Sequence, residues 1–331
     1  MNVTRSLLLL VLLCSPALGQ KLPLDQAEGA EEIVATFSIV ARDPATQELG
    51  IAVQSRAFRA GAIVPFAKAG VGAIATQAAA NQSYGPRGMA MLEQGMSPEQ
   101  VVQRLTSEDS GRATRQLAII DAQGRLKAYT GTGTNAWAGH IEGKDYSVQG
   151  NILAGEGVVK AMAKAFEETK GELAVRLMAA LDAGQAAGGD ARGMQAGAIY
   201  VVKPITDPSV TTDKWVDVRV DDSPNPFKEL RRLLNIALAG RHSQLSGQLA
   251  TEGKFTEAIE AQKQALTMNP TDDQLIYGLA QRYAQAGDAP NSVKTLKQAI
   301  AKHAGWKVLA GRNVNFDKVK GDPEFKKLIG S

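Results

Sequence analysis

The order of strand-like and helix-like segments in the first two thirds of this 331-residue chain limits its fold more than any other feature. Paired apolar, β-branched segments alternate with helical periodicity and end in a closing strand. The predicted strands span 35–42, 49–54, 62–67, 72–76, 115–121, 126–130, 194–203 and 215–220. The predicted helices span 89–105, with a break at Gly95 and a new helix start at 97–99, and then 157–169 and 172–183. This order predicts an α+β domain at 35–220, a four-layer α/β/β/α sandwich with helices covering two stacked sheets.

The chain from 227 to 331 is helical in pattern and contains an internal repeat. Gly253 and Gly287 lie 34 residues apart, as do several apolar pairs around them, and this spacing is the tetratricopeptide period. We therefore predict a small all-α tetratricopeptide-like domain at 227–331, which a linker at 221–226 joins to the sandwich. Such repeats offer a surface for a protein partner.

The N-terminus has the features of a secretory signal peptide. Arg5 supplies the positive charge, 7–13 the short apolar segment, and 17–19 a small-x-small cleavage site. We predict a signal peptide at 1–19 and a flexible lead-in at 20–34. The mature protein is then expected in the periplasm or outside the cell, with no membrane association after signal removal.

Cysteine and charge exclude several classes of function. The single cysteine, Cys14, lies in the predicted signal peptide, so disulfides and thiolate metal sites are not expected in the mature chain. Three scattered histidines without clustered ligands give no pattern for a metal, and no cofactor is expected. A net charge of +3 without a basic stripe argues against a nucleic-acid partner.

Six blocks in the sandwich segment resemble the family called domain of unknown function 1028. They occur in the same order as in the family and read 36–44 (TFSIVARDP), 54–56 (QSR), 75–77 (ATQ), 84–88 (YGPRG), 149–154 (QGNILA) and 188–190 (GGD). The family is grouped with the N-terminal-nucleophile hydrolases. The resemblance therefore implies the hydrolase type of four-layer sandwich and, as a candidate activity, cleavage of an amide bond in a small-molecule or peptide-like substrate.

The resemblance also implies a catalytic set. Thr36 matches the nucleophile, Lys68 falls near the superfamily's lysine, and Asp190 matches its late acidic residue. The early acidic position of the superfamily is Gln54 or Ser55 in this chain. Activation by the α-amine requires a cut before Thr36. The alternative interpretations are a structural strand threonine, a solvated strand-end lysine and a turn aspartate.

A second group of polar residues is predicted to bind substrate. It lies at strand ends and before a helix, where amides, hydroxyls and a guanidinium would meet a carbonyl or carboxylate. Its members are Gln54, Ser55, Arg56, Gln77, Asn81, Tyr84 and Asn151. The structural alternatives are a surface arginine after a sheet edge for Arg56 and a helix cap for 81–84.

Two functions fit these observations. The first is an exported hydrolase that uses Thr36 after processing. The second is a non-catalytic periplasmic binding protein that uses the sandwich cleft and the helical repeats. A third possibility is self-association into a homo-oligomer through the sheet or helical faces.

Overall fold

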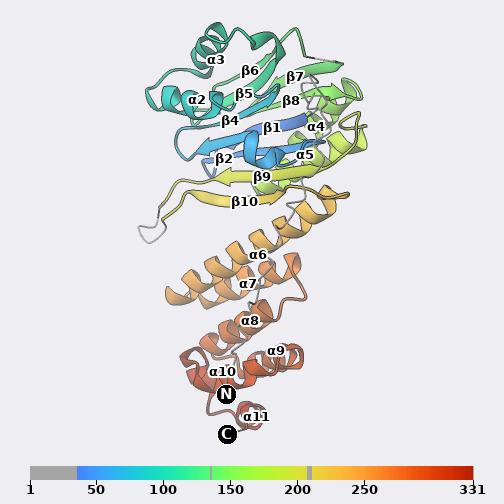
Figure 1. The fold of residues 1–331 in the computed structure, drawn as a ribbon. Coiled ribbons are helices and arrows are strands. Elements are labelled where there is room, and N and C mark those ends of the chain that lie inside the picture. Colours follow the sequence, from blue (N-terminus) through green and yellow to red (C-terminus); the bar gives the residue numbers. More distant parts are fainter. Residues whose placement is uncertain (1–35, 135, 207–210, 331) are drawn as a thin grey trace, which may run out of the picture. The chain divides into compact units, whose positions relative to one another are not determined.

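The computed structural model describes residues 36–134, 136–206 and 211–330, so the predicted signal peptide and lead-in lie outside it. Two antiparallel sheets form the first part of the described chain (Figure 1). The larger has the strand order β10-β9-β2-β1-β8-β7 and the smaller β3-β4-β5-β6. The strands of the larger sheet are β1 (Thr36–Asp43), β2 (Glu48–Ser55), β7 (Trp137–Gly143), β8 (Tyr146–Leu153), β9 (Ala196–Val202) and β10 (Lys214–Val220), and those of the smaller are β3 (Pro65–Lys68), β4 (Gly72–Ala78), β5 (Arg115–Asp121) and β6 (Leu126–Thr130).

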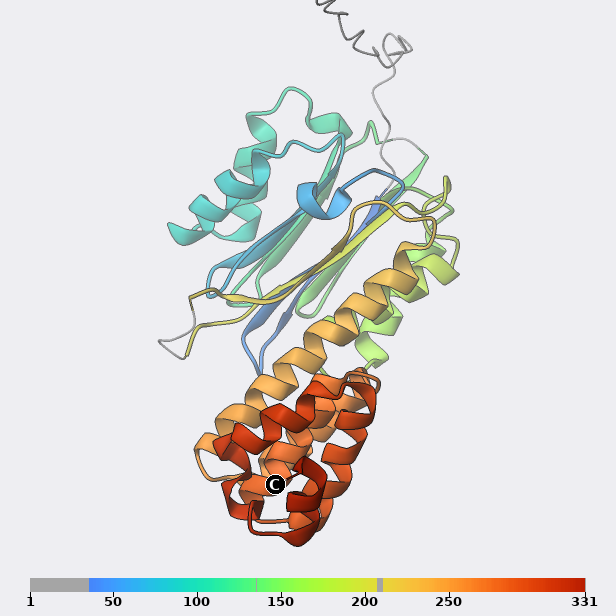
Figure 2. The same ribbon diagram turned by 60° about the horizontal axis from the view of Figure 1, so that its bottom comes forward.

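Helices cover the outer face of each sheet, and Figure 2 shows the resulting layers. Helices α2 (Tyr84–Glu93) and α3 (Pro98–Ser107) pack on the smaller sheet through Ile74, Leu117 and Ile119. On the larger sheet lie α4 (Gly157–Glu168), α5 (Leu173–Ala186) and the first half of α6 (Pro226–Thr251). The short helix α1 (Ala60–Ile63) precedes β3. The α+β prediction is thus confirmed, with two stacked sheets between helices.

The central strand β1 shows why the two sheets stack. Its residues alternate, so Phe37 and Ile39 point to the outer helices while Val40 joins the apolar cluster between the sheets. At the other end of β1, the inward positions are Thr36 and Ser38, which are polar and buried. The space between the sheets is therefore apolar at one end and polar at the other.

Two local predictions need correction. The predicted strand at 62–67 begins only at Pro65, because 60–63 form α1, whose Gly61 approaches β9 so closely that a side chain would meet Ala198. No strand was predicted at β7 or β8, since these segments carry at least as many glycine and polar residues as apolar ones. The predicted break at Gly95 is confirmed, because α2 ends before it and Ser97 caps α3 after it.

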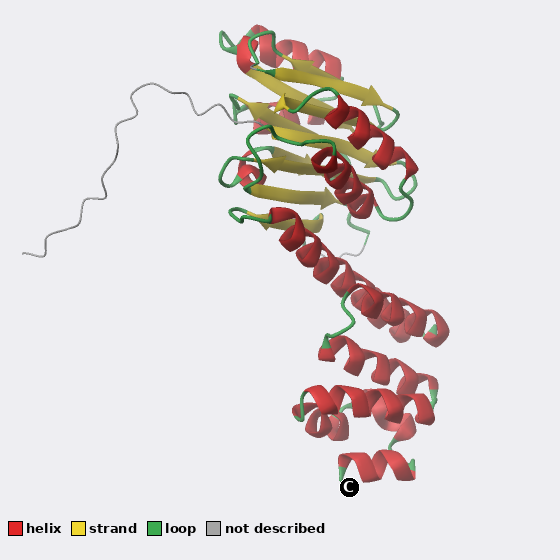
Figure 3. Cartoon of the chain, turned by 90° about the vertical axis from the view of Figure 1, so that its right-hand side faces the viewer, coloured by secondary structure: helices red, strands yellow, loops and turns green. Residues whose placement is uncertain are grey.

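The rest of the described chain is helical, as predicted (Figure 3). After α6 come α7 (Phe255–Met268), α8 (Asp273–Ala286), α9 (Ala289–Lys302), α10 (Gly305–Arg312) and α11 (Pro323–Ile329). The repeat is visible in its hydrogen bonds: Ser246 donates to the Ala258 carbonyl, and Ser292 donates to the Ala280 carbonyl. Among the described residues no helix has both the length and the apolar character needed to cross a bilayer.

One carboxylate ties α2 to the smaller sheet. Asp109 accepts hydrogen bonds from Arg115 Nε (2.9 Å), the Tyr84 hydroxyl (2.8 Å), Asn81 Nδ2 (3.2 Å) and the Gly111 N–H (2.7 Å). The bond from the Arg115 guanidinium is the main cause that holds the pKa of Asp109 well below its ordinary value. Burial, followed by the hydrogen bond to Asp109 and the negative charge of that carboxylate, raises the pKa of Tyr84.

This cluster predicts a pH dependence of stability. Because the pKa of Asp109 is lowered in the folded state, its contribution is complete above the ordinary aspartate value of about 4 and is lost as the pH falls below it. We expect Asp109→Asn to lower the free energy of unfolding at pH 7 by about 1–3 kcal/mol, and to flatten its decline in acid, as measured by urea unfolding between pH 2 and 7.

The matched control is Asp317→Asn, since Asp317 is exposed and forms an ion pair with Lys320 near the surface. A loss within about 0.5 kcal/mol is expected there. Equal losses in the two variants would contradict the structural role of Asp109.

Candidate functional site

The hydroxyl of Thr36 lies at the polar end of the space between the sheets. Thr36 is the first described residue of β1 and pairs in register with Ser55 of β2 and Asn151 of β8. All three side chains are on the inner face and buried. The Thr36 and Ser55 hydroxyl oxygens are 2.9 Å apart, and Ser55 Oγ also accepts from the Ala57 N–H at 3.1 Å. The structure thus brings Thr36, Ser55 and Asn151 together.

Two side-chain amides hold the Thr36 backbone. Gln77 Nε2 and Asn151 Nδ2 both reach the Thr36 carbonyl, at 3.4 and 3.5 Å, and both donate to Gln116 Oε1, at 2.8 and 3.0 Å. Gln116 comes from β5 of the opposite sheet and is fully buried. Thr36 is therefore held by two amides, one from each sheet, and Gln116 accepts a hydrogen bond from both of them.

The network extends from Gln116 toward the surface. Gln116 Nε2 donates to the Gly150 carbonyl and to Thr130 Oγ1, which lies 2.9 Å from His140 Nδ1. Burial is the main cause that lowers the pKa of His140. A second branch passes from Gln77 Oε1 to Ser38, whose hydroxyl accepts from Gln149 Nε2 at 2.6 Å.

Two buried amide oxygens near Thr36 have no hydrogen-bond partner in the described part of the protein: Asn151 Oδ1 and Gln54 Oε1. Gln54 pairs in register with Phe37, so it faces the outer side of the sheet, where its Nε2 donates to the Gly193 carbonyl. A buried acceptor without a partner costs stability, and such atoms are often completed by a ligand, a water molecule or a further group of the protein.

Asp190 lies next to this cluster without touching Thr36. Its carboxylate accepts from the Arg56 N–H at 3.0 Å and pairs with Arg192, and its backbone bridges Leu153 at the end of β8. The carboxylate is fully buried, so its negative charge is balanced by these donors. Asp190 thereby fixes the turn that follows Ser55. The Arg56 side chain is exposed.

Three predicted site residues lie elsewhere. Lys68 pairs with Gly72 at one end of the smaller sheet, whereas Gln77, five positions along β4 and so roughly 16 Å away, contacts Thr36. The exposed Lys68 ammonium instead bonds Glu93 at 2.8 Å, which raises its pKa. Asn81 and Tyr84 bind Asp109 in the cluster described above.

Sequence reasoning missed Gln116, Ser38 and Gln149. Each is a polar residue at an inward position of a strand, and Gln116 comes directly before the apolar run 117–120 of β5. Its place at the start of a buried strand was the available signal, because a buried amide in a strand needs hydrogen-bond partners.

The groups around Thr36 are uncharged, and this limits the reactions that the site could catalyse. Among the described residues, the hydrogen-bond partners of the Thr36 hydroxyl and carbonyl are a hydroxyl and two amides, and none of these is a general base. In the described ranges no group of three or more histidine, cysteine, aspartate or glutamate side chains could hold a metal ion.

Comparisons with known proteins give a family and a relative of known structure. Residues 36–230 match the model of a family of unknown function, DUF1028, and residues 249–310 match a tetratricopeptide repeat model. A crystal structure of protein SPO2555 from Silicibacter pomeroyi, assigned to the same DUF1028 model, is similar with a TM-score of 0.55 and 34% identity, over 60% of this chain and 84% of that one. A search of curated proteins found no match.

The match to the family model covers more than half of the chain and includes the strands that carry Thr36, Ser55, Gln77, Gln116 and Asn151. The relative is aligned over most of its own length at 34% identity. The chain therefore belongs to the DUF1028 family, and it carries a tetratricopeptide-like helical region after the family domain.

Proposed function

We propose that this protein is an exported hydrolase of the N-terminal-nucleophile type, which cleaves an amide bond with Thr36 after the bond between residues 35 and 36 is cut. The observation that carries the proposal is the Thr36 hydroxyl at the start of the central strand, 2.9 Å from Ser55 Oγ and next to the unpartnered Asn151 Oδ1. Since none of the hydrogen bonds to this hydroxyl within the described ranges comes from a base, the freed α-amine supplies one.

The reaction follows from that arrangement. The Thr36 hydroxyl adds to the carbonyl carbon of the substrate while its proton passes to the α-amine of Thr36. The C–N bond then breaks, and the leaving nitrogen takes that proton, which leaves an ester on Thr36 Oγ1. Water hydrolyses the ester, releases the acid and returns the hydroxyl.

The neighbouring residues have positioning roles in this proposal. Ser55 orients the hydroxyl, and Asn151 Oδ1 accepts from the new α-amine, because both share the inner face and register position of Thr36. Gln77 and Gln116 hold the first peptide unit of β1 in place. Asp190 keeps the turn after Ser55 in its conformation. Lys68 has no part in it.

A second candidate function is supported by the helical region. Tetratricopeptide repeats commonly bind protein segments, and the Thr36 hydroxyl is fully buried in this chain. On this alternative the protein is a periplasmic binding protein, and the polar network only stabilises the sandwich.

Processing and labelling distinguish the two functions. We expect the purified mature protein to contain a chain that begins at Thr36, and a β-lactone to acylate it on Thr36 Oγ1 with a mass increase equal to the whole lactone. Intact-mass and peptide mass spectrometry measure both. Thr36→Ala should abolish labelling, whereas Thr36→Ser should retain it, because serine keeps the hydroxyl.

The control is Thr46→Ala, since Thr46 lies in the exposed turn after β1. It should process and label as the unaltered protein does. A mature chain that keeps residues before Thr36 and resists the lactone would exclude the nucleophile and favour the binding protein.

The buried amides give a separate prediction. Gln116→Met keeps much of the side-chain volume but removes the donor and acceptor that join Gln77, Asn151 and Thr130. We expect a loss of about 1–3 kcal/mol in unfolding free energy, because the partner amides remain buried without bonds. Lactone labelling should slow as well. Unchanged stability and labelling would contradict the role of the network.

A further inference from the structure

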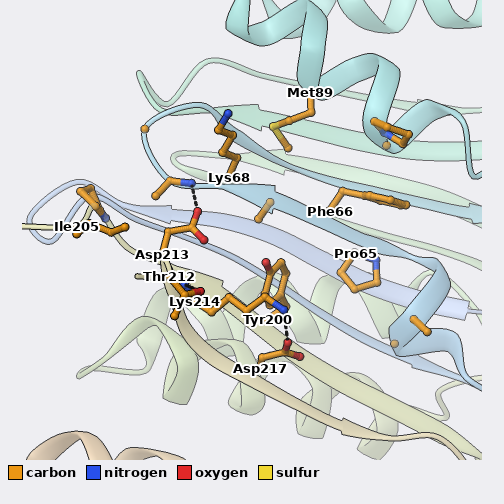
Figure 4. A pocket seen from close by; sticks show the side chains of 18 of the residues that line it. Pro65, Phe66, Lys68, Met89, Tyr200, Ile205, Thr212, Asp213, Lys214 and Asp217 are labelled. Atoms are coloured by element: carbon orange, nitrogen blue, oxygen red, sulfur yellow. Dashed lines mark hydrogen bonds and ion pairs between the residues drawn. The ribbon is translucent and has the colours of Figure 1, made fainter. Parts of the chain in front are cut away.

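A groove of about 930 Å³ lies beside the outer edge of the smaller sheet, away from Thr36 (Figure 4). One wall is β3, the edge strand, and the other is formed by β9 and β10 of the larger sheet. The side chains that shape it include Phe66, Met89, Tyr200, Asp213, Lys214 and Arg219. Thr36 does not line it.

The backbone of β3 has a free side toward this groove. The Thr76 N–H donates to the Val64 carbonyl at 3.1 Å, and the Val71 N–H donates to the Lys68 carbonyl at 3.1 Å, so even-numbered residues of β3 face β4. In an antiparallel ladder the odd-numbered residues then face outward. The N–H and C=O of Ala67 and the C=O of Pro65 thus lie on the open edge.

The outward N–H of Ala69, just after β3, already has a hydrogen-bond partner. The Ala69 N–H donates to Asp213 Oδ2 at 2.9 Å, so a carboxylate oxygen from the segment before β10 takes the place that the carbonyl of an added strand would occupy (Figure 4). Asp213 closes one end of the edge and leaves the Ala67 and Pro65 groups beside the groove. Within the described residues, no further hydrogen bond involves the Ala67 N–H.

The walls suit a narrow chain with alternating side chains. Phe66 and Met89 offer an apolar surface on the side of α2, and Tyr200 faces the groove from β9. Lys214 shares Asp217 with Arg219, at 2.9 and 3.5 Å, so two cations share one carboxylate. A bound side chain of negative charge is therefore favoured at this wall.

We propose that this groove binds an extended peptide segment, which adds as a strand to β3. The Ala67 N–H donates to a peptide carbonyl, and the Ala67 and Pro65 carbonyls accept from peptide N–H groups. Pro65 has no N–H, so recognition at that position uses only the carbonyl. An acidic side chain of the peptide lies at Lys214 and Arg219. The proposal does not depend on catalysis at Thr36.

The experiment uses the full-length protein and the probe Ac-Thr-Val-Glu-Val-Thr-Val-NH2. Hydrogen exchange detected by NMR should show new protection of the Ala67 amide when the probe is added. The control probe has the same side chains but N-methyl groups on alternate residues, which remove its N–H donors, and it should give no protection. A probe with Lys in place of Glu should bind more weakly.

Two variants separate backbone pairing from side-chain effects. Ala67→Pro removes the outward N–H at a position where an edge strand tolerates proline, and it should weaken binding about tenfold or more. Ala67→Val keeps the N–H and should bind as the unaltered protein does. No protection of Ala67 by the unmodified probe at millimolar concentration would overturn the proposal. Equal binding by the Pro and Val variants, or edge-to-edge dimerisation on addition of the probe, would also overturn it.

Discussion

The structure depends on a set of buried hydrogen bonds that cross between the two sheets. Gln116 of the smaller sheet accepts from Gln77 and Asn151 and donates to the Gly150 carbonyl, and the two donors also reach the Thr36 carbonyl. Each such bond contributes about 0.5–1.5 kcal/mol, but an unmade one costs more, so the set specifies one way of stacking the sheets. The apolar cluster between the sheets also stabilises the stack, but apolar burial has no preferred direction and so does not by itself specify how the sheets are stacked.

The same bonds hold in place the residue that we propose as the nucleophile. A threonine at the start of a strand would ordinarily fray, but here its carbonyl is held from two sheets and its hydroxyl by Ser55. Rigid placement of a nucleophile before substrate binding is what catalysis by proximity needs. The groups around the Thr36 hydroxyl are uncharged, so in the proposed mechanism the base is the α-amine that a cut before Thr36 would create. Processing therefore decides between the two proposed functions.

Two separate parts of the sandwich thus present different groups. At the polar end, side-chain amides surround a hydroxyl, whereas at β3 the backbone itself lies open beside a groove. Asp213 connects this edge to the segment before β10, so the larger sheet contributes to the boundary of the groove. The helical repeats follow β10 directly through α6, whose Arg241 donates to the Trp215 carbonyl.

The sequence alone determined the order of most strands and the helical repeats, because periodicity and turn chemistry are local properties. Through the resemblance to a family it also singled out Thr36, Ser55 and Asn151 as candidate site residues. Only the tertiary structure showed that Lys68, on β3, lies beside the end of β4 that is far from Gln77 and Thr36. It also showed that Asn81 and Tyr84 belong to the Asp109 cluster. Strand register sets these distances, and register arises from pairing between segments far apart in the chain. The role of Gln116 was hidden for the same reason, since its partners come from β4, β6 and β8.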